Sequence, residues 1–534
     1  MTRQILIATD ARSRVQGSRH QHRGRLPRRA KYLAVVLAIA GLTIATPEAY
    51  AQSGSTAYWY GTLSPNWSGT GNWSYSTTGG ATSIVPTSGA NLRWFGSSTS
   101  NRTSTNDLTD LSVNGISFQG ATGTVVLNGN KLTLTSGISH VSTSVTLNLP
   151  LELNAGISME AGASQLTING NITEIGGSRG VNLQSGTAFL TGSNSFSGGM
   201  IIGVASNSAF SVNALANIGV AQPLGTGTTI ELRNGSIIYT GTTASTNKRI
   251  QIGRNLAGSS ATAGFTNNGT GAVTWTGSQA LGTSNTNSSS VFTLGGSNSD
   301  DNTWQSVIAN NSATGLIGLT KSGTGKWILS GSNTYDGLTT VSAGTLLVNG
   351  NQSGALGAVS VAAGAILGGT GTLGGASAAI TGTVAPGLSD ALGTLSFAGS
   401  AMNFSSGGSL LAQLNSNPAV FTSDLLSLTG AGSLTLGGSS ILDLVGPAAF
   451  TTSGTYTLAT FASGSLTGQF TTVRYNGTTF ANPTNPNAVN SGGTLVYNGD
   501  SIQFVVVPEP ATLVLAGLGV GLAGLMLKHR RRPL

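Results

Sequence analysis

The body of this chain alternates apolar and polar residues with a period of two. In one stretch the apolar residues occupy every second position, namely Val145, Leu147, Leu149, Leu151 and Leu153. This period predicts β-strands with one buried face, because successive side chains of a strand point to opposite sides. Similar short runs occur at residues 132–134 and 166–168. Since no segment of the body has an apolar stripe of helical period, the sequence predicts an all-β fold.

Asn-Gly pairs separate these apolar runs. Such a pair readily adopts the positive φ angles of a tight turn, so each one marks a corner between strands. The pairs begin at Asn114, Asn128, Asn169, Asn234, Asn268, Asn349, Asn476 and Asn498.

One sequence motif occurs twice. Residues 186–198 read GTAFLTGSNSFSG, and residues 325–337 read GKWILSGSNTYDG. Three short strands and a return turn form one coil of a β-solenoid, which cannot bury its own apolar face, so the motif predicts stacked coils. Stacking places Asn and Thr over like residues and predicts side-chain hydrogen-bond ladders. The matching pairs are Gly186 with Gly325, Leu190 with Leu329, Gly192 with Gly331, Ser193 with Ser332, Asn194 with Asn333, Phe196 with Tyr335 and Gly198 with Gly337.

The second copy resembles a known repeat. The stretch from Gly318 to Gly350 reads GLTKSGTGKWILSGSNTYDGLTTVSAGTLLVNG and is similar to the autotransporter-associated β-strand repeat. Residues 186–203 form a weaker copy. The resemblance implies a right-handed parallel β-helix, the architecture of autotransporter passenger domains.

The C-terminal tail combines three features in order. Pro508, Glu509 and Pro510 precede an uncharged run, residues 511–527, and the basic cluster that follows contains Lys528, Arg530, Arg531 and Arg532. As a helix the run is about 26 Å long, near the lower limit for crossing a membrane. The basic cluster would stay on the cytoplasmic side and leave the body outside. The alternatives are a permanent transmembrane anchor and a processing signal.

This tail resembles the PEP-CTERM sorting signal of Gram-negative bacteria. The resemblance implies recognition by exosortase, a membrane protease, with Pro508, Glu509 and Pro510 as the sorting motif.

The N-terminus predicts export. Basic residues dominate the first 31 positions, an apolar run follows from Tyr32 to Ala45, and Ala49-Tyr50-Ala51 forms a small-x-small cleavage site. These features are typical of a signal peptide for the general secretion machinery. The pair Arg28-Arg29 leaves the twin-arginine route as an alternative.

The basic residues near the two ends make the net charge of the full chain positive. The full sequence has a formal net charge of +8, but residues 52–507 contain 11 Lys and Arg against 13 Asp and Glu. The exported body is therefore slightly acidic, and no nucleic-acid partner is expected. The chain has no cysteine, which excludes disulfides and thiolate chemistry.

These features divide the chain into segments. The region at 386–507 either continues and caps the solenoid or forms a small β-sandwich, and continuation is favoured. The expected segments are a signal peptide at 1–51, an N-terminal cap and first strands at 52–120, a β-solenoid at 121–385 with its clearest repeat at 318–350, a C-terminal β segment or cap at 386–507, and the sorting tail at 508–534.

Residues for catalysis are scarce. The exported body has one histidine, His140, which we expect in a surface or corner position. Asp300 and Asp301 are adjacent and would point to opposite faces of a strand, so we expect a solvated loop rather than a catalytic pair. Asp107 and Asp110 are candidates for weak calcium binding. No catalytic residue and no metal ligand is assigned.

Tryptophans are the remaining candidates for ligand contact. The cluster Trp59, Trp67 and Trp73 is the best candidate for stacking on sugars. Trp327 aligns with Phe189, one position off, and is expected in the core.

Two functions remain open from the sequence. The favoured one is a non-enzymatic surface or matrix protein, a structural and adhesive β-solenoid that binds exopolysaccharide and contributes to biofilm. The alternative is a β-helical polysaccharide hydrolase or lyase, which needs two or three carboxylates on one solenoid face.

Overall fold

The structure, a computed structural model, describes the central part of the chain. Two compact units divide the chain, Met1–Pro47 and Glu48–Leu534, and all described residues belong to the second. Within the described ranges, regular structure consists of strands, and no helix there has the length and apolar character for a membrane crossing. The ranges are 49–50, 54–78, 82, 84–95, 102–139, 143–204, 208–252, 261–279, 289–387, 391–417, 420–429, 432–448, 450–480, 488–489 and 493–507.

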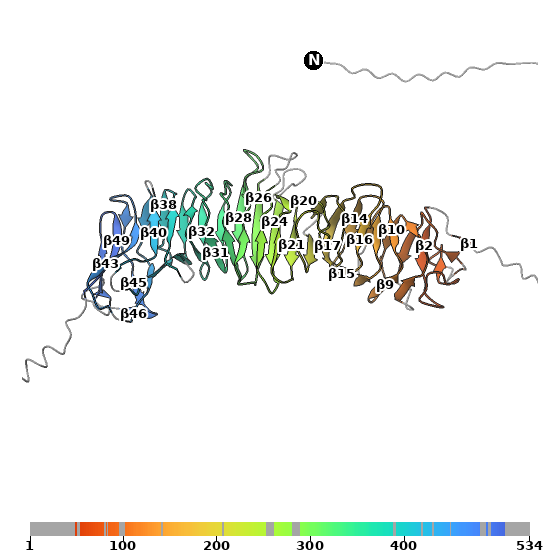
Figure 1. The fold of residues 1–534 in the computed structure, drawn as a ribbon, viewed down its shortest axis with the longest axis horizontal. Helices are drawn as coiled ribbons and strands as arrows, with labels where there is room; N and C mark the ends of the chain where they lie inside the picture. The colour runs from red at the N-terminus through yellow and green to blue at the C-terminus, as the bar shows by residue number, and fades with distance from the viewer. Residues whose placement is uncertain are drawn as a thin grey trace, which may run out of the picture. The chain divides into compact units, whose positions relative to one another are not determined.

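The strands form three faces that recur in a fixed order along the chain (Figure 1). A complete coil contributes a strand to the first, the second and the third face in that order. Among the described residues, the first face has no strand between Ile252 and Thr372, and the third face has none between Glu174 and Ala244. Strands β8 (Gly115–Ser117), β9 (Val125–Gly129) and β10 (Leu132–Leu134) form one complete coil. Each pairs in parallel with the corresponding strand of the next coil. The protein is therefore all-β, with parallel sheets stacked in register, consistent with a β-solenoid.

The first face begins with a parallel ladder and continues in the later coils with a separate sheet. The ladder contains β2 (Thr56–Trp59), β5 (Asn91–Trp94), β8, β11 (Ile138–Ser139), β14 (Ile157–Glu160), β17 (Val181–Leu190), β18 (Met200–Ile202), β20 (Thr229–Leu232) and β23 (Arg249–Ile252). The later sheet contains β34 (Thr372–Leu373), β37 (Thr394–Phe397), β40 (Leu425–Leu428) and β43 (Gly454–Thr460).

The second face is a parallel ladder that runs from β6 to β44. Strand β17 bends from the first face to the second, because its N-terminal part pairs with β14 and its C-terminal part with β15. The strands are β6 (Thr103–Asn106), β9, β12 (Val145–Leu147), β15 (Leu166–Ile168), β17, β19 (Ser208–Val212), β21 (Gly235–Tyr239), β24 (Ala261–Asn267), β26 (Ser290–Gly296), β28 (Ile317–Lys321), β30 (Thr339–Val341), β32 (Val359–Val361), β35 (Ala378–Ile380), β38 (Ala401–Asn403), β41 (Ser433–Thr435) and β44 (Leu466–Thr467).

The third face consists of two sheets. The early sheet contains β7 (Ser112–Val113), β10, β13 (Leu151–Leu153) and β16 (Ile172–Glu174). The later sheet contains β22 (Ala244–Thr246), β25 (Val273–Trp275), β27 (Asn302–Trp304), β29 (Lys326–Leu329), β31 (Thr345–Val348), β33 (Ile366–Gly369), β36 (Thr383–Pro386), β39 (Ser409–Gln413), β42 (Ile441–Val445), β45 (Thr472–Tyr475) and β46 (Thr478–Phe480).

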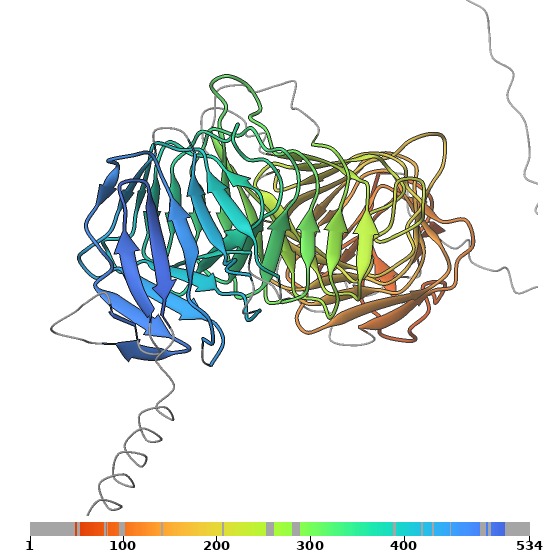
Figure 2. The same cartoon turned by 60° about the vertical axis from the view of Figure 1, so that its left-hand side comes forward.

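Antiparallel strands occur at both ends of this arrangement. Near the start, β3 (Trp73–Ser74) pairs antiparallel with β2 and with β4 (Ile84–Val85), and β1 (Ala49–Tyr50) pairs in parallel with β4. Near the end, β43 is followed by antiparallel β49 (Ser501–Val506), β48 (Gly493–Tyr497) and β47 (Ala488–Val489), drawn in blue in Figure 2. Parallel pairing on the third face continues through β36, β39, β42 and β45. The exact segment boundaries stay predictions.

Like residues stack on one another inside the coils. Leu132 pairs with Leu151, which pairs with Ile172, and all three side chains are fully buried. Neighbouring coils are spaced by about 4.8 Å, so each side chain packs directly on its counterpart. The period-two alternation of the sequence therefore separates the core from the surface, as predicted.

The predicted asparagine ladder is confirmed on the outside of the second face. The Asn148 amide donates to Asn128 Oδ1 at 2.8 Å, and the Asn169 amide donates to Asn148 Oδ1 at 2.9 Å. Thr191 continues the row by donating to Asn169 Oδ1 at 2.7 Å. Each side chain satisfies its neighbour in the adjacent coil, so the row fixes the register of four coils.

The repeated motif places an asparagine inside each copy. Asn194 Oδ1 accepts from the Ile172 N–H at 2.7 Å, and its amide donates to the Pro223 carbonyl at 2.8 Å. Asn333 repeats this arrangement: its Oδ1 accepts from the Ile308 N–H at 2.7 Å, and its amide donates to Gln352 Oε1. Both asparagines are buried. Each therefore joins the preceding coil to the following one, which explains why the motif conserves this residue between its two copies.

Candidate functional site

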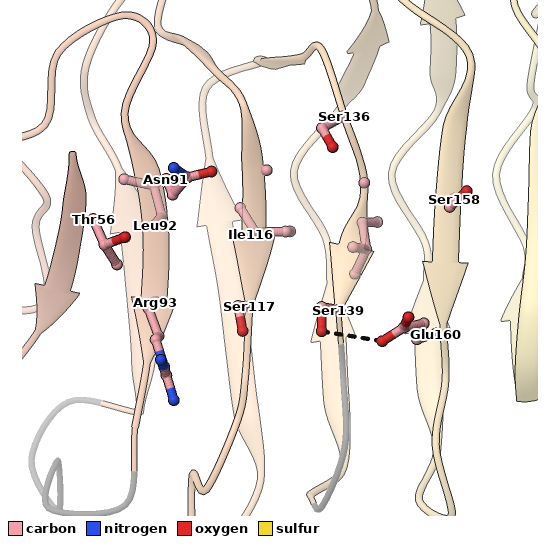
Figure 3. A pocket seen from close by; sticks show the side chains of 13 residues that line it. Thr56, Asn91, Leu92, Arg93, Ile116, Ser117, Ser136, Ser139, Ser158 and Glu160 are labelled. Carbon is pink, nitrogen blue, oxygen red and sulfur yellow. Dashed lines mark hydrogen bonds between the residues drawn. The ribbon is translucent and has the colours of Figure 1, made fainter. Parts of the chain in front are cut away.

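A polar groove lies on the outside of the first face, across β2, β5, β8, β11 and β14 (Figure 3). We call it the β2–β14 groove, and its volume is about 360 Å³. One row of outward side chains crosses it from coil to coil, in the order Arg93, Ser117, Ser139 and Glu160. Because neighbouring strands are about 4.8 Å apart, this row spans about 14 Å.

Two glycines produce the hollow. A second outward row runs beside the first, from Asn91 through Gly115 and Gly137 to Ser158. A Cβ atom on Gly115 would lie 2.7 Å from the Gly137 carbonyl oxygen, and one on Gly137 would lie 2.3 Å from the Ser158 carbonyl oxygen. Glycine is therefore required by the close approach of the coils, and the missing side chains leave space at the surface.

The two ends of the groove carry opposite charges. At one end the Arg93 guanidinium lies over the Tyr58 ring, with its central carbon 5.7 Å from the ring centroid. The Arg93 Nε atom is buried and has no hydrogen-bond partner among the described residues. At the other end Glu160 accepts a hydrogen bond from the Ser139 hydroxyl at 3.2 Å. The groove thus offers a cation, hydroxyl groups and a carboxylate in sequence along one row.

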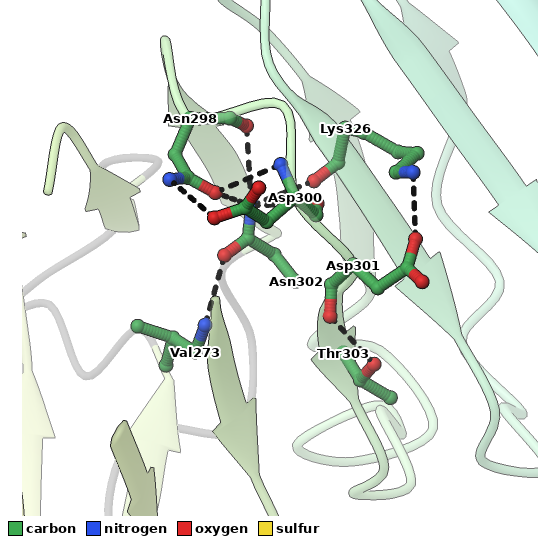
Figure 4. A network of polar contacts seen from close by, with 7 residues as sticks. All are labelled: Val273, Asn298, Asp300, Asp301, Asn302, Thr303 and Lys326. Atoms are coloured by element: carbon green, nitrogen blue, oxygen red, sulfur yellow. Dashed lines mark hydrogen bonds and ion pairs between the residues drawn. The ribbon is translucent and has the colours of Figure 1, made fainter. Parts of the chain in front are cut away.

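Asp300 and Asp301 turn to different partners (Figure 4). They lie in the irregular segment between β26 and β27, where Asp300 Oδ2 accepts from the Asn298 amide at 3.3 Å. Asp301 forms an ion pair with Lys326 at 2.6 Å, and its side chain is 71% exposed. The interpretation of this pair as a solvated loop agrees with the geometry.

The neighbouring asparagine organises this segment. Asn302 is buried, accepts from the Val273 N–H at 2.9 Å and donates to the Lys326 carbonyl at 3.0 Å. It also donates to Asn298 Oδ1 at 2.9 Å. The sequence did not predict this role, although the buried asparagines of the repeated motif make contacts of the same kind.

The Asp107 carboxylate stabilises the turn that contains Ser68. Its Oδ1 accepts from the Ser68 N–H at 2.8 Å, and its Oδ2 accepts from the Ser68 hydroxyl. Asp110 has a positive φ of 54°. Among the described residues, no three His, Cys, Asp or Glu side chains gather in a metal-binding group. Calcium binding by Asp107 and Asp110 stays an untested expectation, and His140 lies outside the described residues.

The other acidic residues lie on separate coils with their own partners. Glu152 pairs with Lys131 at 2.7 Å, and this contact holds the pKa of the Glu152 carboxyl below its ordinary value. Glu231 pairs with Arg233 at 2.8 Å. Glu152 and Glu231 are thus each engaged in a local ion pair.

The prediction that Trp59, Trp67 and Trp73 stack on sugars is wrong. All three side chains are fully buried. The Trp59 and Trp73 rings meet edge to face with centroids 4.9 Å apart, and Trp67 lies 5.6 Å from Trp73 in the same arrangement. These rings fill the interior of the first coils, where their large apolar area is removed from water. Trp327 is also buried, and its predicted place in the core is confirmed.

Two lysines are buried without a carboxylate partner among the described residues. The Lys321 ammonium donates to the carbonyl oxygens of Ser322 at 2.7 Å, Gly323 at 2.8 Å and Ala343 at 3.0 Å. Lys248 donates to the Gly227 carbonyl. Burial lowers the pKa of each lysine to about 8, because the charged form loses its hydration.

The export and sorting residues fall almost entirely outside the described residues. This holds for Ala51, for Pro508, Glu509 and Pro510, for residues 511–527, and for the basic cluster at Lys528, Arg530, Arg531 and Arg532. Ala49 is described and belongs to β1. The individual roles of these residues stay predictions.

Comparison with known proteins identifies two sequence families within the chain. The Passenger-associated-transport-repeat matches residues 184–203 and 319–348, and the PEP-CTERM protein-sorting motif matches residues 506–532. The two regions that match the Passenger-associated-transport-repeat contain Asn194 and Asn333, the buried asparagines described above.

One curated protein is similar over a longer stretch. The chain is 31% identical over 230 residues to the Adhesin BmaC autotransporter of Brucella suis biovar 1 (strain 1330). The match covers 42% of this chain but only 6% of that adhesin. No enzymatic family was identified. The sorting motif implies an exported, cell-surface protein that exosortase processes. The chain thus carries autotransporter-associated repeats and a PEP-CTERM sorting motif on an all-β body, part of which is similar in sequence to an autotransporter adhesin.

Proposed function

We propose that this protein is a non-enzymatic structural and adhesive component of the cell surface or extracellular matrix of a Gram-negative bacterium. The general secretion machinery exports it, and cleavage after Ala51 removes the signal peptide. Residues 511–527 then hold it in the membrane until exosortase acts at Pro508, Glu509 and Pro510. The body is a right-handed parallel β-helix that contacts exopolysaccharide.

The observation that carries this proposal is the continuous in-register ladder of the second face. Each coil contacts its neighbours through backbone hydrogen bonds, and the ladder runs from β6 to β44. Such a stack holds many outward side chains at regular intervals, which suits repeated contacts with a polymer. The similarity to an adhesin and the sorting motif support the same function.

Fractionation of the native host, combined with intact-mass measurement, tests the export and sorting part of the proposal. We expect a chain that begins near Gln52, ends near Pro508 and occurs at the surface or in the matrix. A Glu509→Gln variant should retain Lys528 to Leu534 and accumulate in the inner membrane, whereas the control Thr512→Ser should be processed normally. Wild-type protein that retains its tail in the inner membrane would reduce the motif to a permanent anchor.

Attachment assays test the adhesive part. Cells that lack the protein should attach less to a surface and retain less exopolysaccharide, and expression of the Glu509→Gln variant should not restore either property. Depolymerisation of the host polysaccharide by purified protein would contradict a non-enzymatic role and favour the hydrolase or lyase alternative.

A further inference from the structure

We propose that the β2–β14 groove binds an acidic carbohydrate, with the anionic substituent of the sugar on Arg93 and sugar hydroxyls on Ser117, Ser139 and Glu160. This inference rests on the proposed surface function, because it names the ligand class that the exported body contacts. The proposed function says only that the body contacts exopolysaccharide. This inference places that contact in the β2–β14 groove.

Arg93 is the group that selects an anion. Its guanidinium forms no ion pair with any described residue, and its Nε atom is buried without a hydrogen-bond partner. The Arg93 side chain as a whole is only half-buried, so a carboxylate or sulfate in the groove can accept charge-assisted hydrogen bonds from the terminal N–H groups of the guanidinium. The Tyr58 ring beneath the guanidinium holds it in place, with its carbon 5.7 Å from the ring centroid.

The remainder of the row fits a sugar rather than a bare anion. Ser117 and Ser139 present hydroxyl groups at successive strand spacings beyond Arg93, and both donate or accept hydrogen bonds. Glu160 at the far end accepts hydrogen bonds and would repel a second anionic group. The groove therefore favours a ligand with its negative charge at one end and neutral hydroxyls along its length, as in a short oligosaccharide containing a uronic acid.

A second hollow shows what distinguishes the β2–β14 groove. It lies on the second face across β21, β24 and β26, has a volume of about 260 Å³ and is also floored by glycines, Gly235 and Gly264. Its lining consists of uncharged residues, including Asn234 and Thr262. Glycines are therefore sufficient to produce a hollow. The combination of Arg93 and Glu160 distinguishes the β2–β14 groove, because these charges select the ligand.

Titration calorimetry with the protein purified from its host tests this assignment. The probes are a short xylo-oligosaccharide that carries a single glucuronic acid at one end, sulfated dextran, and neutral dextran. We expect the glucuronic acid oligosaccharide to bind and neutral dextran not to bind. Arg93→Gln should weaken binding of this oligosaccharide about tenfold or more, because a charge-assisted contact is lost. Arg249→Gln, an exposed arginine on β23 of the same face, is the matched control and should leave binding unchanged.

A blocking variant tests the location independently of charge. Ser136 lines the groove and is exposed, so Ser136→Tyr should fill the groove and abolish binding. Thr262→Tyr makes the equivalent change in the second hollow and should have no effect. The unfolding midpoint of each variant verifies that it is folded. Sulfated dextran binding that also depends on Arg93 and Ser136 would widen the ligand class from carboxylates to anionic sugars in general.

Three results would overturn the assignment. They are equal binding of neutral dextran, equal weakening by Arg93→Gln and Arg249→Gln, and binding by the Ser136→Tyr variant at wild-type affinity. Because these measurements use purified protein in solution, they stand apart from the fractionation test. A correctly sorted protein whose groove binds no sugar would refute only this inference, and a bound sugar on a protein retained in the inner membrane would refute only the sorting proposal.

Discussion

Replacing Asn333 with alanine should destabilise the coils on both sides of it. The side chain is 1% exposed and connects two other coils, because it accepts from the Ile308 N–H and donates to Gln352 Oε1. Alanine cannot form either hydrogen bond. Ile308 and Gln352 are themselves buried, so water does not readily replace the lost partner.

The loss of stability expected for Asn333→Ala follows from the number of polar groups that it leaves without hydrogen-bond partners. A buried donor or acceptor that loses its hydrogen bond costs about 1–3 kcal/mol, and Asn333→Ala leaves one of each. The expected loss is therefore about 2–6 kcal/mol in the free energy of opening these coils. Ser332→Ala changes the exposed neighbour in the same turn and should cost less than about 0.5 kcal/mol.

Hydrogen exchange measured by mass spectrometry suits this prediction, because a long stack of coils need not unfold in one step. A loss of 2 kcal/mol should speed exchange about 30-fold in peptides that contain Ile308 and Gln352. Peptides from distant coils should change little, since each coil contacts only its neighbours. Exchange in Asn333→Ala that matches Ser332→Ala would refute the argument that this asparagine holds the coils together.

Three further predictions concern the interior and one surface ion pair. Burial lowers the pKa of Lys321 to about 8 and raises that of Tyr335 to about 12, so folded protein loses the lysine proton before unfolded protein does and keeps the tyrosine proton longer. Stability measured by urea unfolding should therefore rise from about pH 8 to pH 10 and fall above about pH 10, and Lys321→Met should reduce the rise to the part that Lys248 contributes. Trp59→Ala should cost about 3–5 kcal/mol in the same assay, because it empties a buried site, and a change of less than 1 kcal/mol would contradict its place in the core. Asp301→Asn should cost less than about 1 kcal/mol, since the Asp301 side chain is 71% exposed, and a larger loss would mean that the pair is structural.

The strands could be predicted from the sequence because the alternation of apolar and polar residues is a local property of each strand. The alternation around Leu147 and Leu151 depends only on which side of a strand faces the core, and the structure buries both residues. The Asn128 ladder followed from stacking alone. The internal role of Asn333 was not evident, because the same residue type also suits a turn, and only the arrangement of neighbouring coils places it inside.

The groove was much harder to foresee. Arg93, Ser117, Ser139 and Glu160 are separated by unequal intervals, since coils differ in the length of their loops, so no fixed sequence period brings them together. The tryptophans misled for a related reason: Trp59 and Trp73 belong to antiparallel strands, where the regular pattern of the coils does not indicate which side is buried.

The antiparallel strands beyond β43 affect whether a second molecule can add its strands to this end of the stack. A stack of parallel strands is an open template, and a second molecule can in principle add its own coils to an exposed last strand. Here β49 runs opposite to β43, β48 runs in the same direction as β43, and β47 runs opposite again, while β46 runs opposite to β45. On the first and third faces, the last strand therefore does not offer the polarity that a further parallel coil would need. The antiparallel strands thus cap two of the three faces and disfavour the addition of parallel coils from a second molecule at this end of the stack.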